Sequence, residues 1–216
     1  QSEAPPAPAP TTVARASADA SAHADATTAR NDATTRLVRA SSGKIVWRPE
    51  PGDEAALASI LTPTPGAQTD AVTYQPPEPG ALGLSLRVSG RTLLVLPGHF
   101  GDVKVSAEVD LGRFRGTVAV AHHIESIDTA GLMEVATRGE VALVELIRGR
   151  RTSLDTGRTN LSGAPVVLTV SAAGRHLKGW LYGKQVVHGH VKPRAPGSCG
   201  ILLDGVGSVR IVSMEI

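Results

Sequence analysis

The chain of 216 residues has a single cysteine, Cys199, so it cannot form an internal disulfide and its stability must come from a core. Hydrophobic residues make up 41% of the chain, enough to build one. No apolar run approaches the roughly 20 residues that a membrane-spanning helix needs. We therefore expect no transmembrane segment, and a buried, unreactive thiol at Cys199.

The chain also has no large excess of positive or negative charge. The formal net charge is +2, and charged residues are 19% of the chain. The densest basic cluster is Arg148, Arg150 and Arg151, and Gly149 between them favours a turn at a strand end. A nucleic-acid-binding face needs clustered lysines and arginines, so we expect no nucleic-acid partner.

Aromatic residues are scarce, at 3% of the chain. Sugars pack their C–H faces on flat rings, so few positions can serve a carbohydrate-binding site. Trp180 and Tyr182 are two residues apart, which places them on one face of an extended strand. With His188 they are the candidate carbohydrate-binding residues, and the alternative is that Trp180 fills the core.

Residues 1–35 form an Ala/Pro-rich segment whose only large aliphatic residue is Val13. Such a segment buries too little to offset its ordering entropy, so we expect an extended arm that orders on a partner. Its composition and its start at Gln1 favour a processed, exported protein in the periplasm or outside the cell. The candidate partner-binding residues of the arm are Pro5, Pro6, Pro8, Pro10, Val13 and Arg15.

Residues 36–80 form a second region, with a β-hairpin, one short helix and a Pro-rich wrapping loop. Two apolar runs, 37–39 and 44–47, flank a Ser-Ser-Gly turn. Asp53 is a helix cap before apolar residues at helical spacing up to Leu61, and Pro63 ends that helix.

Residues 81–216 have the pattern of an all-β sandwich, in which short strands alternate with turn residues. Within 103–109 the odd positions are apolar and the even ones mostly polar, as in a strand with one wet face. Ser89-Gly90 and Asp204-Gly205 suit tight hairpin turns. The expected strands are 82–88, 91–96, 103–110, 117–123, 131–137, 141–147, 166–171, 176–182, 185–188, 200–203 and 209–214.

The stretch 167–187, VLTVSAAGRHLKGWLYGKQVV, resembles a hairpin of concanavalin A-like lectin/glucanase domains, including laminin-G-like and keto-disaccharide-hydrolase-like members. Residues 197–203 and 208–214 look like the last strands of the same domains. The resemblance covers roughly 101–216 and implies a two-sheet antiparallel jelly roll. Because the matched positions are turn and core positions, it implies little about function.

The stretch Glu140-Val-Ala-Leu-Val-Glu145 is similar to the E-x-D-x-x-E strand of family-16 glycoside hydrolases. That resemblance implies a nucleophile and an acid/base on one bulged strand. Ala142 stands where the family has its central Asp, and without a bulge the odd spacing puts the two carboxylates on opposite faces. Glu140 and Glu145 are therefore the only catalytic candidates, and we expect no enzyme.

His188-Gly189-His190 places two imidazoles on one face of a strand, where zinc needs a third ligand such as His176 or Asp204. Nothing in the sequence places a third ligand beside these two histidines. The pattern therefore favours histidines on an edge strand, with no metal and no cofactor. His122-His123 points to opposite faces if extended, with one ring buried.

Three functions from different classes remain. The first is a non-catalytic accessory or scaffold subunit that binds a larger envelope-associated or membrane protein assembly through its arm and sandwich surface. The alternative is a carbohydrate-binding module built on Trp180 and Tyr182, and the third is a glycoside hydrolase.

Overall fold

A computed structural model describes residues 39–41, 44–50, 71–76, 79–162 and 165–216. The expected arm over residues 1–35, the short helix ending at Leu61 and most of the Pro-rich loop lie outside these described residues. The hairpin expected at 37–47 is present in its described part, where Arg39 pairs with Val46. Within the described part of the chain, no helix has the length and hydrophobicity needed to cross a membrane.

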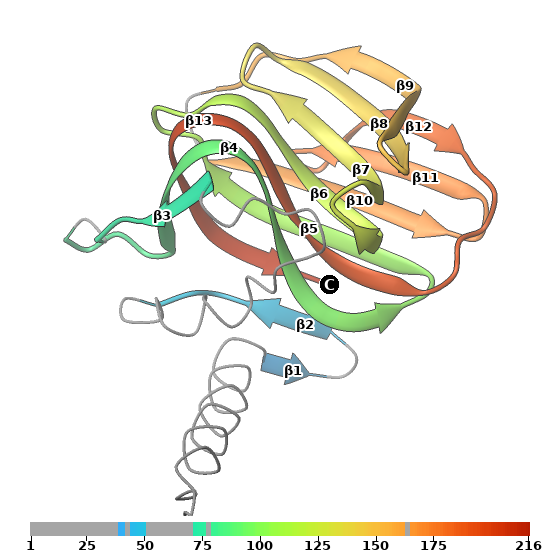
Figure 1. Cartoon of the computed structure of the whole chain (residues 1–216), viewed down its shortest axis with the longest axis horizontal. Helices are drawn as coiled ribbons and strands as arrows, with labels where there is room; N and C mark the ends of the chain where they lie inside the picture. Colours follow the sequence, from blue (N-terminus) through green and yellow to red (C-terminus); the bar gives the residue numbers. More distant parts are fainter. Residues whose placement is uncertain (1–38, 42–43, 51–70, 77–78, 163–164) are drawn as a thin grey trace, which may run out of the picture.

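The described residues form antiparallel strands, as the alternation predicted (Figure 1). They are β1 (Arg39–Ser41), β2 (Lys44–Trp47), β3 (Val72–Tyr74), β4 (Leu84–Phe100), β5 (Val103–Asp110), β6 (Arg115–Ser126), β7 (Thr129–Ala136), β8 (Glu140–Ile147), β9 (Arg150–Arg158), β10 (Val166–Ala173), β11 (His176–Leu181), β12 (Lys184–His190) and β13 (Gly197–Glu215).

The strands form two facing layers that share β13. The order is β12-β11-β10-β5-β13-β6-β7-β8-β9, and β4 pairs with β13 along most of its length. The first part of β13 pairs with β6 and its last part with β5. The outer strands β9 and β12 approach each other, since the His188 N–H donates to Asp155 Oδ2 at 2.8 Å. The result is the expected jelly-roll sandwich, nearly closed into a barrel (Figure 1).

The main core lies between the layers. On β5, Val103, Val105, Ala107 and Val109 are buried, as the alternation predicted. Cys199 is buried among the same side chains, and burial raises the pKa of its thiol to about 12. A thiol that stays protonated is a poor nucleophile, so Cys199 acts as a small core residue.

A second apolar cluster covers the outer face of the β6–β8 layer. It consists of Leu93, Val95, Ala119, Ala121, Ile124, Ile127, Ala130, Leu132, Ala142, Val144, Leu146 and Leu202. Because Leu94 and Leu96 belong to the main core, β4 is buried on both sides, which explains its continuous apolar run. This layer therefore has no wet face at these positions.

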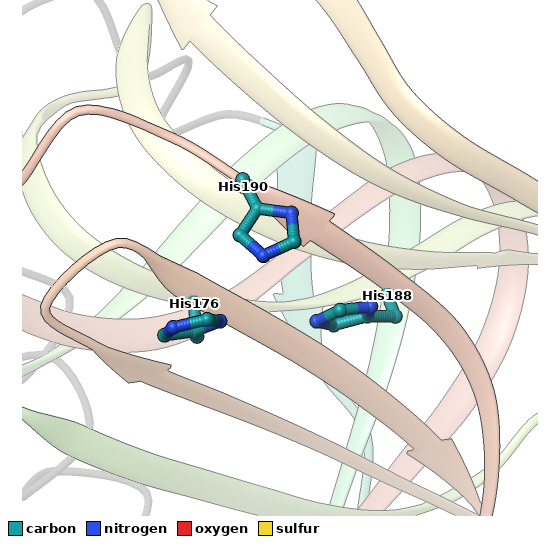
Figure 2. Close-up of side chains that lie close together, drawn as sticks. All are labelled: His176, His188 and His190. Atoms are coloured by element: carbon teal, nitrogen blue, oxygen red, sulfur yellow. The ribbon is translucent and has the colours of Figure 1, made fainter.

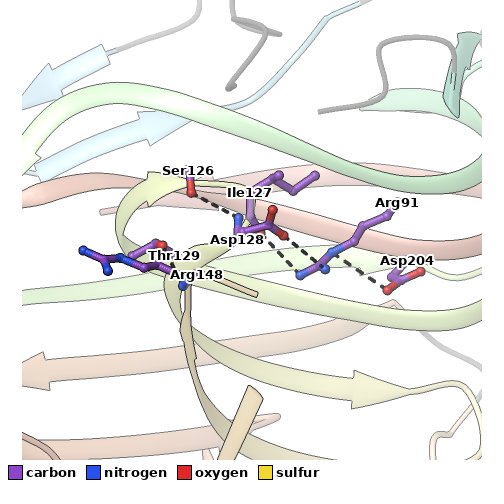
Figure 3. Close-up of polar contacts among 7 residues, drawn as sticks. All are labelled: Arg91, Ser126, Ile127, Asp128, Thr129, Arg148 and Asp204. Carbon is purple, nitrogen blue, oxygen red and sulfur yellow. Dashed lines mark hydrogen bonds and ion pairs between the residues drawn. The ribbon is translucent and has the colours of Figure 1, made fainter. Parts of the chain in front are cut away.

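Ile124 and Ile127 of the second cluster come from the tip of the β6–β7 hairpin, and Arg91 of β4 holds that tip. Arg91 Nη2 donates to the Ile127 carbonyl at 3.4 Å, and the guanidinium pairs with Asp128 at 3.9 Å and Asp204 at 4.0 Å (Figure 3). The Asp128 carbonyl also accepts the Gly149 N–H at 2.9 Å. The tip is thus fastened to β4 and to the β8–β9 turn.

Ser89-Gly90 and Asp204-Gly205 are not turns, contrary to the sequence prediction. They lie inside the long strands β4 and β13, where Gly90 pairs with Gly205 and Gly205 pairs with Gly116 of β6. A Cβ atom at Gly116 would meet the Asp204 carbonyl, and one at Gly205 would meet the Arg115 carbonyl. The glycines therefore allow the backbones of β4, β13 and β6 to approach each other closely. In the sequence, a glycine with this role looks the same as a glycine in a turn.

His122 and His123 form a buried pair at a bend in β6. His123 has a left-handed backbone (φ 49°), and the two Nδ1 atoms lie 2.8 Å apart in a hydrogen bond. The His122 ring covers Gly131, which has no room for a side chain, and its buried Nε2 has no hydrogen-bond partner among the described residues. Burial, and to a smaller extent the nearby His123 and Arg194, lower the pKa of His122 to about 3.

The first prediction concerns the paired glycines Gly90, Gly116 and Gly205, where the strands approach each other closely. We expect Gly116→Ala to destabilise the fold by on the order of 3 kcal/mol, because the new methyl group displaces backbone in β13. Gly174→Ala is the matched control: its Cβ would meet nothing within 4 Å, so only the strain of its positive φ (55°) is added, about 1 kcal/mol. Urea unfolding compares the variants, and equal losses would contradict the close approach of the strands.

The histidine pair predicts how stability depends on pH. Between pH 6.5 and about 3 the unfolded chain binds a proton at His122 that the folded chain does not bind. The contribution of His122 to the free energy of unfolding is therefore fully present above pH 6.5. It falls as the pH is lowered through this window, by at most about 1.4 kcal/mol per pH unit.

His122→Phe keeps a ring over Gly131 and removes the titration. We expect its free energy of unfolding to depend less on pH than that of the wild type. Carboxylates and His123, whose pKa is lowered by burial, titrate in both proteins, so the difference between the two curves reports His122 together with its hydrogen bond to His123. Parallel curves measured by urea unfolding from pH 7 to pH 4 would refute this role.

Candidate functional site

The outer face of β5, β10, β11 and β12 is the polar face of the sandwich. Along β11 the burial alternates, so Leu177 and Leu181 point into the core while His176, Lys178 and Trp180 point outward. The same alternation on β5 turns Lys104, Ser106 and Glu108 outward. Register then decides which of these side chains become neighbours.

Trp180 lies on this outer face and is half-buried. It pairs with Thr169 of β10 on one side and Gln185 of β12 on the other. The Lys104 ammonium stands 5.8 Å from the centre of its ring, and Ser106 Oγ lies 2.8 Å from Thr169 Oγ1. Trp180 therefore does not fill the core between the layers, and polar groups surround its ring.

Tyr182 and His188 occupy different parts of this region. Strand β11 ends at Leu181, so Tyr182 lies in the β11–β12 turn with a left-handed backbone (φ 49°) and is 40% exposed. His188 is exposed on β12 and pairs with Lys178. The strand-face argument for Trp180 and Tyr182 thus fails at the turn, although both rings remain accessible.

Glu140 and Glu145 lie on opposite faces of β8. Val141 and Leu143 belong to the main core, while Ala142, Val144 and Leu146 belong to the second cluster, so the side chains alternate without interruption. The only register shift in this region is on the β9 side of the pairing. The two carboxylates therefore do not project from one side of β8, as the acid/base pair of a bulged strand does.

The environments of the two carboxylates also differ from those of an acid/base pair. A hydrogen bond from Arg158 lowers the pKa of Glu140, which keeps it ionised, whereas a general acid needs a raised pKa. Glu145 pairs with Arg194 at 3.8 Å. Both carboxylates are accounted for as partners of arginine.

A groove of about 610 Å³ lies at another part of the surface, beside β5 and β13. Its lining includes Gln75, Ser85, Asp110, Arg113 and Arg210. Asp110 and Arg210 pair with each other at 2.7 Å, which neutralises one cation of the groove. The groove offers hydrogen bonds but its lining has no aromatic ring.

Sequence reasoning found Trp180 but not the residues around it. Lys104, Ser106, Thr169 and Gln185 come from three other strands. Alternation marks Lys104 and Ser106 of β5 as outward positions, and no local signal in the sequence groups the four residues with Trp180. The register that brings them to one ring depends on pairing across β10 and β12, which no local pattern specifies.

Comparison with known proteins gives the fold but no close relative. No protein-family model matches the chain. No curated protein matches it either. Among solved structures it is similar to the carbohydrate-binding module CBM66 from Bacillus subtilis, at 16% identity and a TM-score of 0.56, over 69% of this chain and 96% of that one.

Two further solved structures are similar to the chain at lower TM-scores. A protein with a galectin-like fold from Bacillus subtilis matches at 11% identity and a TM-score of 0.50, over 68% of this chain and 91% of that one. A β-1,3-1,4-glucanase (lichenase) from a mouse hindgut metagenome matches at 8% identity and a TM-score of 0.44, over 83% of this chain and 82% of that one. The similarity to CBM66 and the order of the strands agree on the concanavalin-like jelly-roll fold that the resemblance implied.

Proposed function

We propose that the protein is a carbohydrate-binding module and that the outer face of β5, β10, β11 and β12 around Trp180 holds the sugar. The observation that carries the proposal is a half-buried tryptophan that points away from the core, on a sheet face otherwise rich in polar side chains. An indole buries much apolar area on contact, which suits the C–H face of a pyranose ring.

The groups around the ring supply the second part of the interaction. Sugar hydroxyls need donors and acceptors, and Thr169, Gln185, Ser106 and Lys104 offer both kinds within the neighbouring strand positions. Lys104 is exposed, and the flexible four-carbon stem of a lysine allows its ammonium to reach a sugar hydroxyl beside the ring. Because the strands fix the backbone positions, little ordering entropy is lost on binding.

Binding without catalysis is the form of the function that these observations favour. The catalytic hypothesis rested on Glu140 and Glu145, which face opposite sides of β8 and pair with arginines. The similarity to CBM66 supports a binding role for this fold. We therefore propose a non-catalytic module.

The accessory-subunit hypothesis rested on the arm over residues 1–35, which lies outside the described residues. No comparison supports a protein partner in a membrane assembly, whereas the similarity to the carbohydrate-binding module CBM66 favours a glycan. Export to the periplasm or the cell exterior fits a glycan ligand and stays part of the proposal.

The test is a glycan array followed by isothermal titration with the best glycan. We expect Trp180→Ala to weaken binding roughly 30-fold, because a central tryptophan contributes at least about 2 kcal/mol at a binding surface. Trp180→Phe keeps a flat ring and should retain part of the affinity. Tyr182→Ala should have the smaller effect, because its ring lies in the turn.

Two results would decide against the proposal. One is a wild-type protein that binds no glycan on the array. The other is Trp180→Ala that binds as tightly as the wild type while Arg113→Ala, in the groove beside β5 and β13, loses affinity. Glu145→Gln is the catalytic control: we expect unchanged binding and no released product for both this variant and the wild type.

A further inference from the structure

Three histidines from two neighbouring strands lie together on the outer face, at the end of the β11–β12 hairpin opposite its turn (Figure 2). They are His176, at the start of β11, and His188 and His190, at the end of β12. All three are exposed, and their ligand nitrogens lie within 4.8 Å of one another. Among the described residues this is the group of histidine, cysteine and acidic side chains that can hold a metal ion.

The backbone holds the three rings on the same side of the sheet. Gly189 lies between His188 and His190 and faces inward, where a Cβ would come within 3.2 Å of Leu154 Cβ. The two histidines must therefore point outward. His176 pairs directly with His190, which brings the third ring from β11 to the same side.

Strand β12 is also fixed from its free edge. Asp155 of β9 accepts the His188 N–H at 2.8 Å and the Thr156 N–H, through different oxygens. An edge strand with a restrained backbone presents its side chains in one register. The cluster thus stands on two paired strands, with an anchor from a third.

The three rings lie near enough to one another to approach a single ion. The centroid of His190 lies 4.8 Å from those of both His176 and His188, and the latter two are 6.3 Å apart. The ligand nitrogens of the three rings lie within 4.8 Å of one another, and in tetrahedral zinc they lie about 3.3 Å apart, given Zn–N bonds of about 2.0 Å. The exposed rings must therefore rotate to bring their nitrogens onto one ion.

We propose that His176, His188 and His190 form a binding site for a divalent transition-metal ion, with zinc as its natural class of ligand. Neutral imidazole suits Zn²⁺, Cu²⁺ and Ni²⁺, while Ca²⁺ and Mg²⁺ prefer oxygen. Three protein nitrogens leave the fourth position of a tetrahedral ion open to solvent. The site then offers a metal-bound water or a place for an oxygen ligand.

The site goes beyond the pair of edge histidines that the sequence predicted. His176 was one of two third ligands considered there, and the antiparallel pairing of β11 and β12 selects it. Asp204, the other, lies on β13 and pairs with Arg91 of β4. The decisive information is the register His176 to His190, which the hairpin turn at Tyr182-Gly183 sets together with a bulge between Gly179 and Trp180.

Titration of the full chain with Zn²⁺ by calorimetry tests the proposal. We expect one equivalent to bind and a higher Tm with zinc, because an ion that binds the folded state stabilises it. His190→Ala and His176→Ala should each weaken zinc binding at least tenfold. Because both side chains are exposed, the Tm without metal should not change.

Matched controls separate this site from other histidines and from the sugar face. His99→Ala removes an exposed histidine of β4, and Lys178→Ala removes a cation on the same face, so both should keep full zinc affinity. Trp180→Ala should keep it too. The proposal is wrong if the wild type binds no zinc, if Ca²⁺ binds as tightly, or if His99→Ala loses as much affinity as His190→Ala.

Discussion

The arrangement of the described fold depends on one constraint, that a single long strand, β13, takes part in both layers. Over 19 residues it pairs with β2, β4, β5 and β6, and it passes from β6 to β5 near Gly205 and Gly207. A Cβ atom at either glycine would meet the backbone of Arg115 or Arg113. The crossing is therefore possible only where side chains are absent, and it determines how the layers face each other.

The same crossing decides which surface is open. The β6–β8 layer is buried on its inner face by the main core and on its outer face by the second cluster, which Ile127 and the Arg91 contacts complete. The layer of β5, β10, β11 and β12 has a core on one side only, so its outer face carries the polar and aromatic side chains. Both proposed sites lie there because that is where outward positions remain accessible.

Local pattern predicted β5 with its bounds from its alternation, and most of β10 from an apolar run before the Ala173-Gly174 turn. It missed β9, whose sequence RRTSLDTGR is mostly exposed and carries little apolar period. It also divided β4 and β13 at Gly90 and Gly205, since a glycine for close approach looks like a glycine for a turn. The register between strands decides which side chains lie beside Trp180 and that His176 joins His188 and His190. The burial pattern of a single strand does not give this register until the neighbouring strands are known.

Trp180 and His176 stand on the same strand and the same face, which relates the two proposed sites. They are four positions apart, and at about 3.3 Å per residue their Cα atoms are roughly 13 Å apart. The indole and the His176 imidazole therefore occupy separate parts of the face. Lys178 lies between them in sequence and faces the same side, opposite His188. A ligand that contacts only the indole therefore does not need the imidazoles, whereas an extended chain along β11 passes over the ring, the ammonium and the histidines in that order.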